Sequence, residues 1–101
     1  MKILQSRSFE QKTNKFSRAQ KKELESQVKL VVEDPIIGIE KKGDLRGVYV
    51  HKFKIKAIEY LLSYRLVDEN LELIMIGPHE NYYRDLKRYS KKKISEQPDE
   101  G

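Results

Sequence analysis

The spacing of hydrophobic residues changes near the middle of the chain, and this change predicts an α+β fold. From Leu24 to Val32 apolar side chains recur at the helical spacing of three and four residues. From Gly47 onward apolar and polar side chains alternate, which is the two-residue period of a strand. Helices are therefore expected in the N-terminal third and most of an antiparallel sheet after them.

The N-terminal third is expected to form a helical hairpin. Ser17 followed by Gln20 is typical of a capping box at a helix start. Asp34-Pro35 should end that helix, because the residue before proline is disfavoured in helical conformation. A weaker helix should precede it, joined by a short link at 15–17 and capped by Ser6 or Ser8. Its apolar stripe consists of Phe9, Thr13 and Phe16.

The remaining elements complete a single domain. The pattern predicts four strands, a connecting loop over 36–43 and a closing helix, and it predicts no second domain. The expected fold is an N-terminal helical hairpin packed on a mostly antiparallel four-stranded sheet with a C-terminal helix, over residues 1–94, with a disordered tail at 95–101. The strands are expected over 1–5, 51–56, 57–67 and 71–76, and the helix over 79–90 with Tyr82, Leu86 and Tyr89 on one face.

Charge adds a candidate class of partner. The 101 residues carry 21 Lys and Arg against 16 Asp and Glu, a formal net charge of +5. Two segments, 41–56 and 84–93, each contain six basic residues and one acidic residue. A polyanion is the expected partner. The chain has no cysteine, signal-peptide pattern or apolar run long enough to span a membrane, so a cytoplasmic location without membrane association is expected.

The basic residues of the second predicted strand suggest where a polyanion would bind. Lys52, Lys54 and Lys56 alternate with Phe53 and Ile55, as expected for a strand with one buried and one cationic face. Such lysines often only keep a sheet face soluble. Their spacing of about 7 Å along a strand also approximates that of successive phosphates in a nucleic acid. An acidic peptide is an alternative ligand, and Arg65 would extend the patch if the strand register allowed.

A second group of polar side chains follows the last strand. His79 lies close in sequence to Tyr82, Tyr83 and Arg84, which brings together an acid-base candidate, two phenols and a guanidinium. An isolated histidine is more often a turn residue, and Tyr82 also fits core packing. The other histidine, His51, is interpreted as an ordinary strand residue.

Other classes of chemistry have little support in the sequence. The histidines lack the spacing of metal ligands on a helix, the carboxylates are dispersed, and no nucleotide-binding glycine motif occurs. The nucleophile-elbow motif of serine hydrolases is also absent. Neither a metal nor another cofactor is expected.

Four segments stand out in order along the chain: GDLRG at 43–47, HKFK at 51–54, YLLSYR at 60–65 and GPHENYYRDL at 77–86. Together with the order of elements, they resemble the RelE/ParE superfamily of bacterial type II toxins, over about residues 1–90. The resemblance implies a small cytoplasmic ribonuclease that cuts mRNA in the ribosomal A site, arrests growth, uses no metal, and forms a hetero-oligomer with a cognate antitoxin.

The resemblance also implies roles for individual residues. Attack of a 2′-hydroxyl on the adjacent phosphate requires a base, cations for the phosphorane and an acid for the 5′-oxygen. The implied catalytic residues are Lys52, Lys54, His79, Tyr83 and Tyr82, and the implied RNA-binding residues are Arg46, Lys56, Arg65 and Arg84.

One position departs from the best-known branch of the superfamily. That branch has an arginine after the tyrosine of the middle strand, where this chain has Leu61. Arg65 or Arg84 could supply the missing cation, or the histidine-centred branches could be the better model. Two alternatives therefore stay open: a ParE-like toxin that inhibits DNA gyrase without nuclease activity, and a catalytically inactive module that binds RNA or a partner on the same face.

Overall fold

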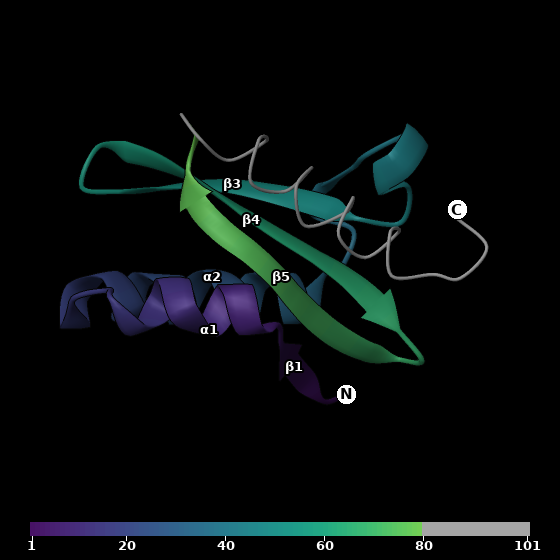
Figure 1. The fold of residues 1–101 in the computed structure, drawn as a ribbon, viewed down its shortest axis with the longest axis horizontal. Coiled ribbons are helices and arrows are strands. Elements are labelled where there is room, and N and C mark those ends of the chain that lie inside the picture. Colours follow the sequence, from purple (N-terminus) through teal and green to yellow (C-terminus); the bar gives the residue numbers. More distant parts are fainter. Residues whose placement is uncertain (80–101) are drawn as a thin grey trace, which may run out of the picture.

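The computed structural model describes residues 1–79, which form one mixed sheet with two helices on one of its faces (Figure 1). The strand order is β1-β5-β4-β3-β2, with β1 parallel to β5 and the other pairs antiparallel. This confirms the predicted α+β class and the mostly antiparallel sheet. The elements are β1 (Ile3–Gln5), α1 (Arg7–Asn14), α2 (Arg18–Glu33), β2 (Ile39–Glu40), the 3-10 turn η1 (Gly43–Leu45), β3 (Tyr49–Ile55), β4 (Ile58–Val67) and β5 (Asn70–Pro78).

The sheet has five strands in the described residues, so the prediction of four was one short. The additional strand, β2, contains two residues and pairs with the start of β3 through Ile39–Val50 and Glu40–Tyr49. A two-residue strand shows no alternation in sequence, which is why the segment 36–43 was predicted as a loop. The predicted C-terminal helix beyond His79 and the predicted tail lie outside the described residues.

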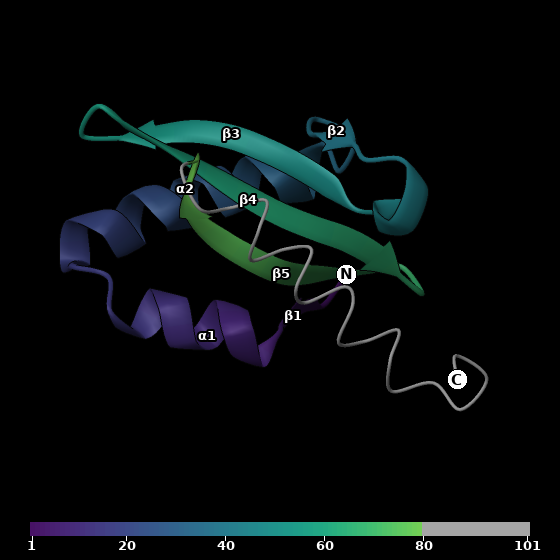
Figure 2. The ribbon, with the colours of Figure 1, turned by 45° about the horizontal axis from the view of Figure 1, so that its top comes forward.

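The helical hairpin forms over the residues predicted for it (Figure 2). Ser6 caps α1 by accepting a hydrogen bond from the Phe9 N–H, and the predicted capping box of Ser17 and Gln20 is present at α2. Helix α2 ends at Glu33, with Asp34 as its C-cap residue directly before Pro35, as predicted. Because α1 ends at Asn14, Phe16 lies in the link instead of on the helix.

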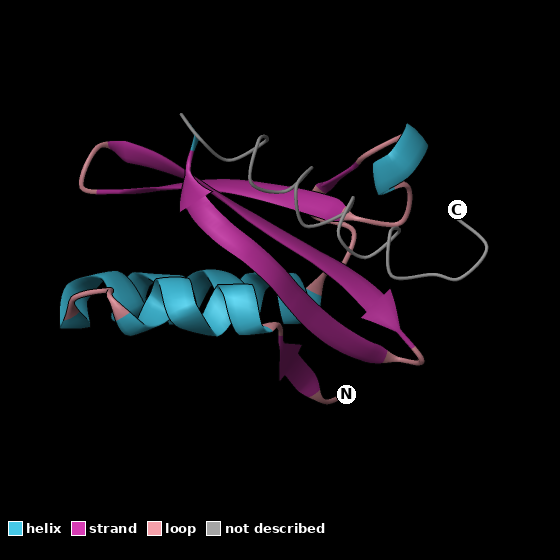
Figure 3. Cartoon of the chain, viewed as in Figure 1, coloured by secondary structure: helices cyan, strands magenta, loops and turns pink. Residues whose placement is uncertain are grey.

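The strand register is set by two short hairpins. Two-residue turns at Lys56–Ala57 and Asp68–Glu69 connect β3 to β4 and β4 to β5, and all four turn residues have positive φ. Such turns match the right-handed twist of the paired strands. An irregularity at Ser63/Tyr64 leaves Ile74 as an extra residue on β5. The sheet is consequently continuous from β1 to β2, with both helices on the same side (Figure 3).

Hydrophobic residues pack on both faces of this sheet. The larger cluster joins the helices to the strands and includes Phe9, Leu24 and Val31. The smaller cluster contains no helix residue and so belongs to the opposite face. Because β4 contributes to both, its residues 60–64 are all buried. The smaller cluster consists of Leu45, Val50, Leu61, Ile74 and Met75, with Val48 packed against it.

A buried tyrosine attaches the loop after α2 to the sheet. The hydroxyl of Tyr64 donates to the carbonyl of Pro35 at 2.7 Å and accepts the N–H of Gly38 at 3.1 Å. The ring is fully buried and stacks on Tyr49, with centroids 5.7 Å apart. The Tyr64 hydroxyl is protonated at neutral pH and can donate, and burial raises its pKa further. The path of the chain into β2 and β3 depends on this contact.

Gly38→Ala should therefore destabilise the protein by about 1–3 kcal/mol, the usual cost of overpacking. A Cβ at Gly38 would lie 2.9 Å from both the Tyr64 hydroxyl and the Val50 carbonyl oxygen. Urea denaturation measures the change in the free energy of unfolding. Gly77→Ala is the matched control, since a Cβ there meets no heavy atom within 4 Å. Equal stability of the two variants would contradict the close approach at Gly38.

Candidate nucleic-acid interface

Two lysines lie on the sheet face away from the helices. Lys52 and Lys54 are exposed, while Phe53 and Ile55 between and beside them are buried in the helix-side cluster. This alternation places both ammonium groups on the lysine face, the name used below for the side of the sheet that carries Lys52 and Lys54. Lys56 does not continue the series: it lies in the β3–β4 turn with φ of 50°. The strand face thus offers two lysines instead of three.

Two of the predicted RNA-binding arginines lie in the described residues, Arg46 in the loop before β3 and Arg65 near the end of β4. Arg46 is exposed directly after η1, where its N–H donates to the Gly43 carbonyl. Arg65 points to the lysine face but at the far end of β4, and its Nε contacts a carboxylate oxygen of Glu72 at 2.5 Å. Four residues along a strand separate Arg65 from Leu61, about 13 Å. The register therefore does not bring Arg65 next to Lys52 or Lys54.

Leu61 provides an apolar centre for the lysine face. It pairs with Lys52 across β3 and with Gly77 across β5, and its side chain is fully buried in the smaller cluster with Val50 and Ile74. A cation is therefore absent at the position where the best-known branch has arginine. Charged groups in the described part of this face lie instead around the apolar cluster.

His79 and Glu59 lie at the same end of the sheet. Pro78, the last residue of β5, pairs with Tyr60, so His79 and Glu59 both adjoin this pair. Glu59 also pairs directly with Lys54 on β3. His79 is exposed, and Glu59 is partly buried. The predicted residues Tyr82, Tyr83 and Arg84 lie outside the described residues, and their roles stay predictions, as do those of His79 and the lysines.

Sequence reasoning did not place Glu59 beside Lys54. Its face was evident from the alternation along β4, but its partner was not, because Lys56–Ala57 lacks the glycine or asparagine that usually marks a two-residue hairpin turn. Without that turn the register of β3 against β4 was undetermined. If Lys56 and Ala57 are taken as the two turn residues, Ile55 pairs with Ile58 and Lys54 pairs with Glu59.

The second histidine belongs to the helix side of the sheet. His51 Nε2 lies 2.8 Å from Gln27 Oε1, and Gln27 Nε2 donates to Glu23 Oε2 at 2.8 Å. The His51 ring stacks on Phe53, with centroids 5.8 Å apart. Burial lowers the pKa of His51, because the charged imidazolium loses hydration there. His51 thus joins β3 to α2 and does not face the lysines.

The lowered pKa of His51 should make stability depend on pH. Below the ordinary histidine pKa of about 6.5, the unfolded chain binds a proton more readily than the native chain. The free energy of unfolding should therefore decrease as the pH falls below about 6.5. Urea denaturation of the wild type and of His51→Gln at several pH values measures this. An identical pH dependence in the two proteins would contradict the account of His51.

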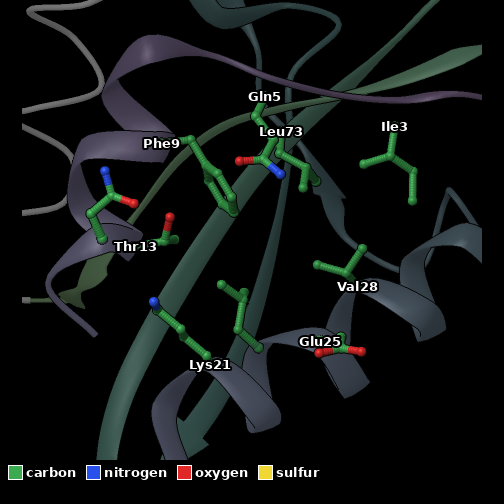
Figure 4. A pocket seen from close by; sticks show the side chains of 10 residues that line it. Ile3, Gln5, Phe9, Thr13, Lys21, Glu25, Val28 and Leu73 are labelled. Carbon is green, nitrogen blue, oxygen red and sulfur yellow. The ribbon is translucent and has the colours of Figure 1, made fainter. Parts of the chain in front are cut away.

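A groove of about 400 Å³ lies on the helix side, between the hairpin and the β1–β5 edge (Figure 4). Phe9 and Leu73 lie on one side of it, and Lys21, Glu25 and Val28 of α2 lie on the other. Its lining mixes apolar and charged side chains. The groove is on the face opposite Lys52 and Lys54, so it is separate from the lysine face.

A family model decides what kind of protein this is. Residues 3–87 match the family described as the ParE-like toxin of type II bacterial toxin–antitoxin systems. The match covers most of the 101 residues. The chain belongs to this toxin family. The resemblance to the RelE/ParE superfamily is thereby confirmed.

Solved structures of RelE/ParE toxins share the fold. A double arginine-to-alanine mutant of E. coli RelE in the free state is 20% identical, with a TM-score of 0.68 over 92% of this chain and 96% of that one. RelE in the intact E. coli RelBE complex is 22% identical, with a TM-score of 0.62 over 78% of this chain and 96% of that one. The YoeB/ParE toxin from Agrobacterium tumefaciens is 19% identical, with a TM-score of 0.64 over 78% of this chain and 99% of that one. No protein with a curated function matches this toxin's sequence.

Two further findings concern metals and membranes. Among residues 1–79, no three His, Cys, Asp or Glu side chains gather closely enough to hold a metal ion. In the same part of the toxin, neither helix is long and apolar enough to cross a membrane.

Proposed function

We propose that this toxin is a metal-independent endoribonuclease that cleaves mRNA in the ribosomal A site. The observation that carries the proposal is the placement of the exposed Lys52 and Lys54 on the sheet face away from the helices, at the end of the sheet where His79 follows β5. Two ammonium groups about 7 Å apart suit adjacent phosphates. Histidine suits proton transfer at neutral pH.

Each residue has a distinct role in the proposed reaction. Lys52 and Lys54 hold the phosphate and stabilise the charge that grows on its oxygens when the 2′-hydroxyl attacks. His79 donates a proton to the departing 5′-oxygen. Tyr82 or Tyr83 stacks on a base, while Arg46, Lys56, Arg65 and Arg84 contact the RNA backbone. The products are a 2′,3′-cyclic phosphate and a 5′-hydroxyl.

The reaction chemistry provides a direct test in a purified system. Ribosomes programmed with a short mRNA are incubated with the toxin, and the RNA ends are analysed with and without EDTA at a concentration that leaves the ribosomes intact. We expect cleavage in both samples, with 2′,3′-cyclic or 3′-phosphate ends. Loss of cleavage with EDTA, or the appearance of 3′-hydroxyl ends, would overturn the proposed mechanism.

An antitoxin is the proposed protein partner of this toxin. E. coli RelE has been solved with RelB and with a peptide of that antitoxin. A cationic face such as the lysine face favours an antitoxin with an acidic C-terminal segment that folds on binding and forms a hetero-oligomer. The product of a short neighbouring gene should therefore bind the toxin and abolish cleavage. An antitoxin with a basic C-terminal segment would contradict this charge argument.

Inhibition of DNA gyrase is the second candidate function. It is favoured by the match to a ParE-like family model and by Leu61 at the position where the RelE branch has arginine. A supercoiling assay with purified gyrase distinguishes the two. We expect no inhibition at toxin concentrations that cleave mRNA. A toxin that binds RNA but neither cleaves mRNA nor inhibits gyrase would instead support the inactive binding module.

A further inference from the structure

We propose that Glu59 is a catalytic residue of this toxin, the base that takes the proton from the attacking 2′-hydroxyl. The inference rests on the proposed ribonuclease function and extends it. The observation that carries it is the register, which brings Lys54 on β3, Glu59 on β4 and His79 directly after β5 to one end of the sheet.

The strand register brings these three residues together. Lys54 on β3 pairs directly with Glu59 on β4, so their Cβ atoms lie about 5 Å apart. On the other side of β4, Tyr60 pairs with Pro78, which places Glu59 and His79 one residue beyond the same pair. Glu59 thus occupies the β4 position between Lys54 on β3 and His79 directly after β5. Cleavage by a 2′-hydroxyl needs a base, an acid and a cation near one phosphate, and these three residues supply one of each.

A carboxylate at this position opposes the binding of RNA. It lowers the positive potential of the lysine face and repels phosphates. A surface that serves only to bind RNA would gain from a neutral or basic side chain there. The cost is offset if the carboxylate acts on the substrate, where it can approach a sugar hydroxyl while Lys54 attracts the phosphate.

The neighbouring position strengthens the assignment. Leu61, two residues further along the same face, is fully buried in the apolar cluster and carries no proton-accepting group. Lysine is protonated at neutral pH and is a poor proton acceptor. Among Lys52, Lys54, Glu59 and Leu61, the carboxylate is therefore the group suited to accept the proton.

The proposed step balances in atoms and charge. The Glu59 carboxylate takes the proton of the 2′-hydroxyl as its oxygen bonds to phosphorus. The bond between phosphorus and the 5′-oxygen breaks, and that oxygen takes a proton from the His79 imidazolium. Glu59 then returns its proton to water, and His79 regains one. No metal, oxidant or co-reactant is consumed.

Glu59→Gln tests the role because it removes the base and keeps the size of the side chain. Single-turnover cleavage of ribosome-bound mRNA should fall by about 10²- to 10⁴-fold. Affinity for RNA should stay equal or increase, because a negative charge is removed. A second variant, Glu59→Ala, opens space for a small acid, so added formate should restore part of its cleavage rate. Formate should not restore Glu59→Gln.

The matched control replaces a glutamate at the other end of β4. Glu69→Gln makes the same charge change in an exposed turn at the opposite end of β4 and should cleave as the wild type does. Wild-type cleavage by Glu59→Gln would overturn the role of Glu59 alone. Slower cleavage that is accompanied by weaker RNA binding and is unaffected by formate would assign Glu59 a structural role. Absence of cleavage by the wild type would overturn the ribonuclease function itself.

Discussion

Replacing His79 with alanine should lower the rate of mRNA cleavage by about 10²- to 10⁴-fold, the usual contribution of a general acid. His79 is exposed and follows Pro78, so the proton donor that this variant lacks lies at the edge of the lysine face. Affinity for RNA should change little, because in the proposed site Lys52 and Lys54, and not His79, bind the phosphates. Single-turnover cleavage and equilibrium binding, measured on the same ribosome complex, separate the two effects.

His51→Gln is the matched control for this experiment. It removes the other histidine, which contacts Gln27 on the helix side of the sheet. Its effect should be on the pH dependence of stability, with cleavage unchanged. If folded His79→Ala cleaved at the wild-type rate and arrested growth equally at equal expression, His79 would be an ordinary turn residue and the assigned site would be wrong.

Removing both strand lysines should weaken binding as well as chemistry. For Lys52→Ala with Lys54→Ala, the slope of log affinity against log salt should become shallower by about 0.7 for each phosphate of single-stranded RNA that the toxin no longer neutralises. Cleavage at saturating toxin should also decrease, because the lysines stabilise charge on the phosphate. Filter binding at several salt concentrations measures the slope.

A double variant on the other face controls for net charge. Lys22→Ala with Lys29→Ala also removes two positive charges, but from exposed positions on α2. Its salt slope should stay close to that of the wild type. An equal decrease in slope for both double variants would show that RNA responds to the total charge of the toxin and not to the lysine face.

The helical hairpin was predictable because its signals are local. The capping box joins Ser17 and Gln20, which are three residues apart in the first turn of α2. The end of the helix depends on Asp34 and Pro35, which are adjacent in sequence. The apolar stripe that contains Leu24 and Val31 then identifies the buried face. Such features need no knowledge of the rest of the chain.

Features that depend on residues distant in sequence could not be predicted in the same way. Strand β2 exists because Ile39 pairs with Val50, and Gly38 is required by the hydroxyl of Tyr64. The candidate site was likewise only partly predictable. The alternation along β3 places Lys52 on the face away from the helices, but only the strand register shows that Arg65 is distant from Lys52 and Lys54.

Mapping of mRNA ends after brief induction in bacteria tests the central claim most directly. A ribonuclease acting in the ribosomal A site should produce fresh 5′-hydroxyl ends inside translated frames, at a fixed position within codons, and His79→Ala should abolish them. DNA damage signalling without new ends in translated frames would contradict the ribonuclease account and support inhibition of gyrase.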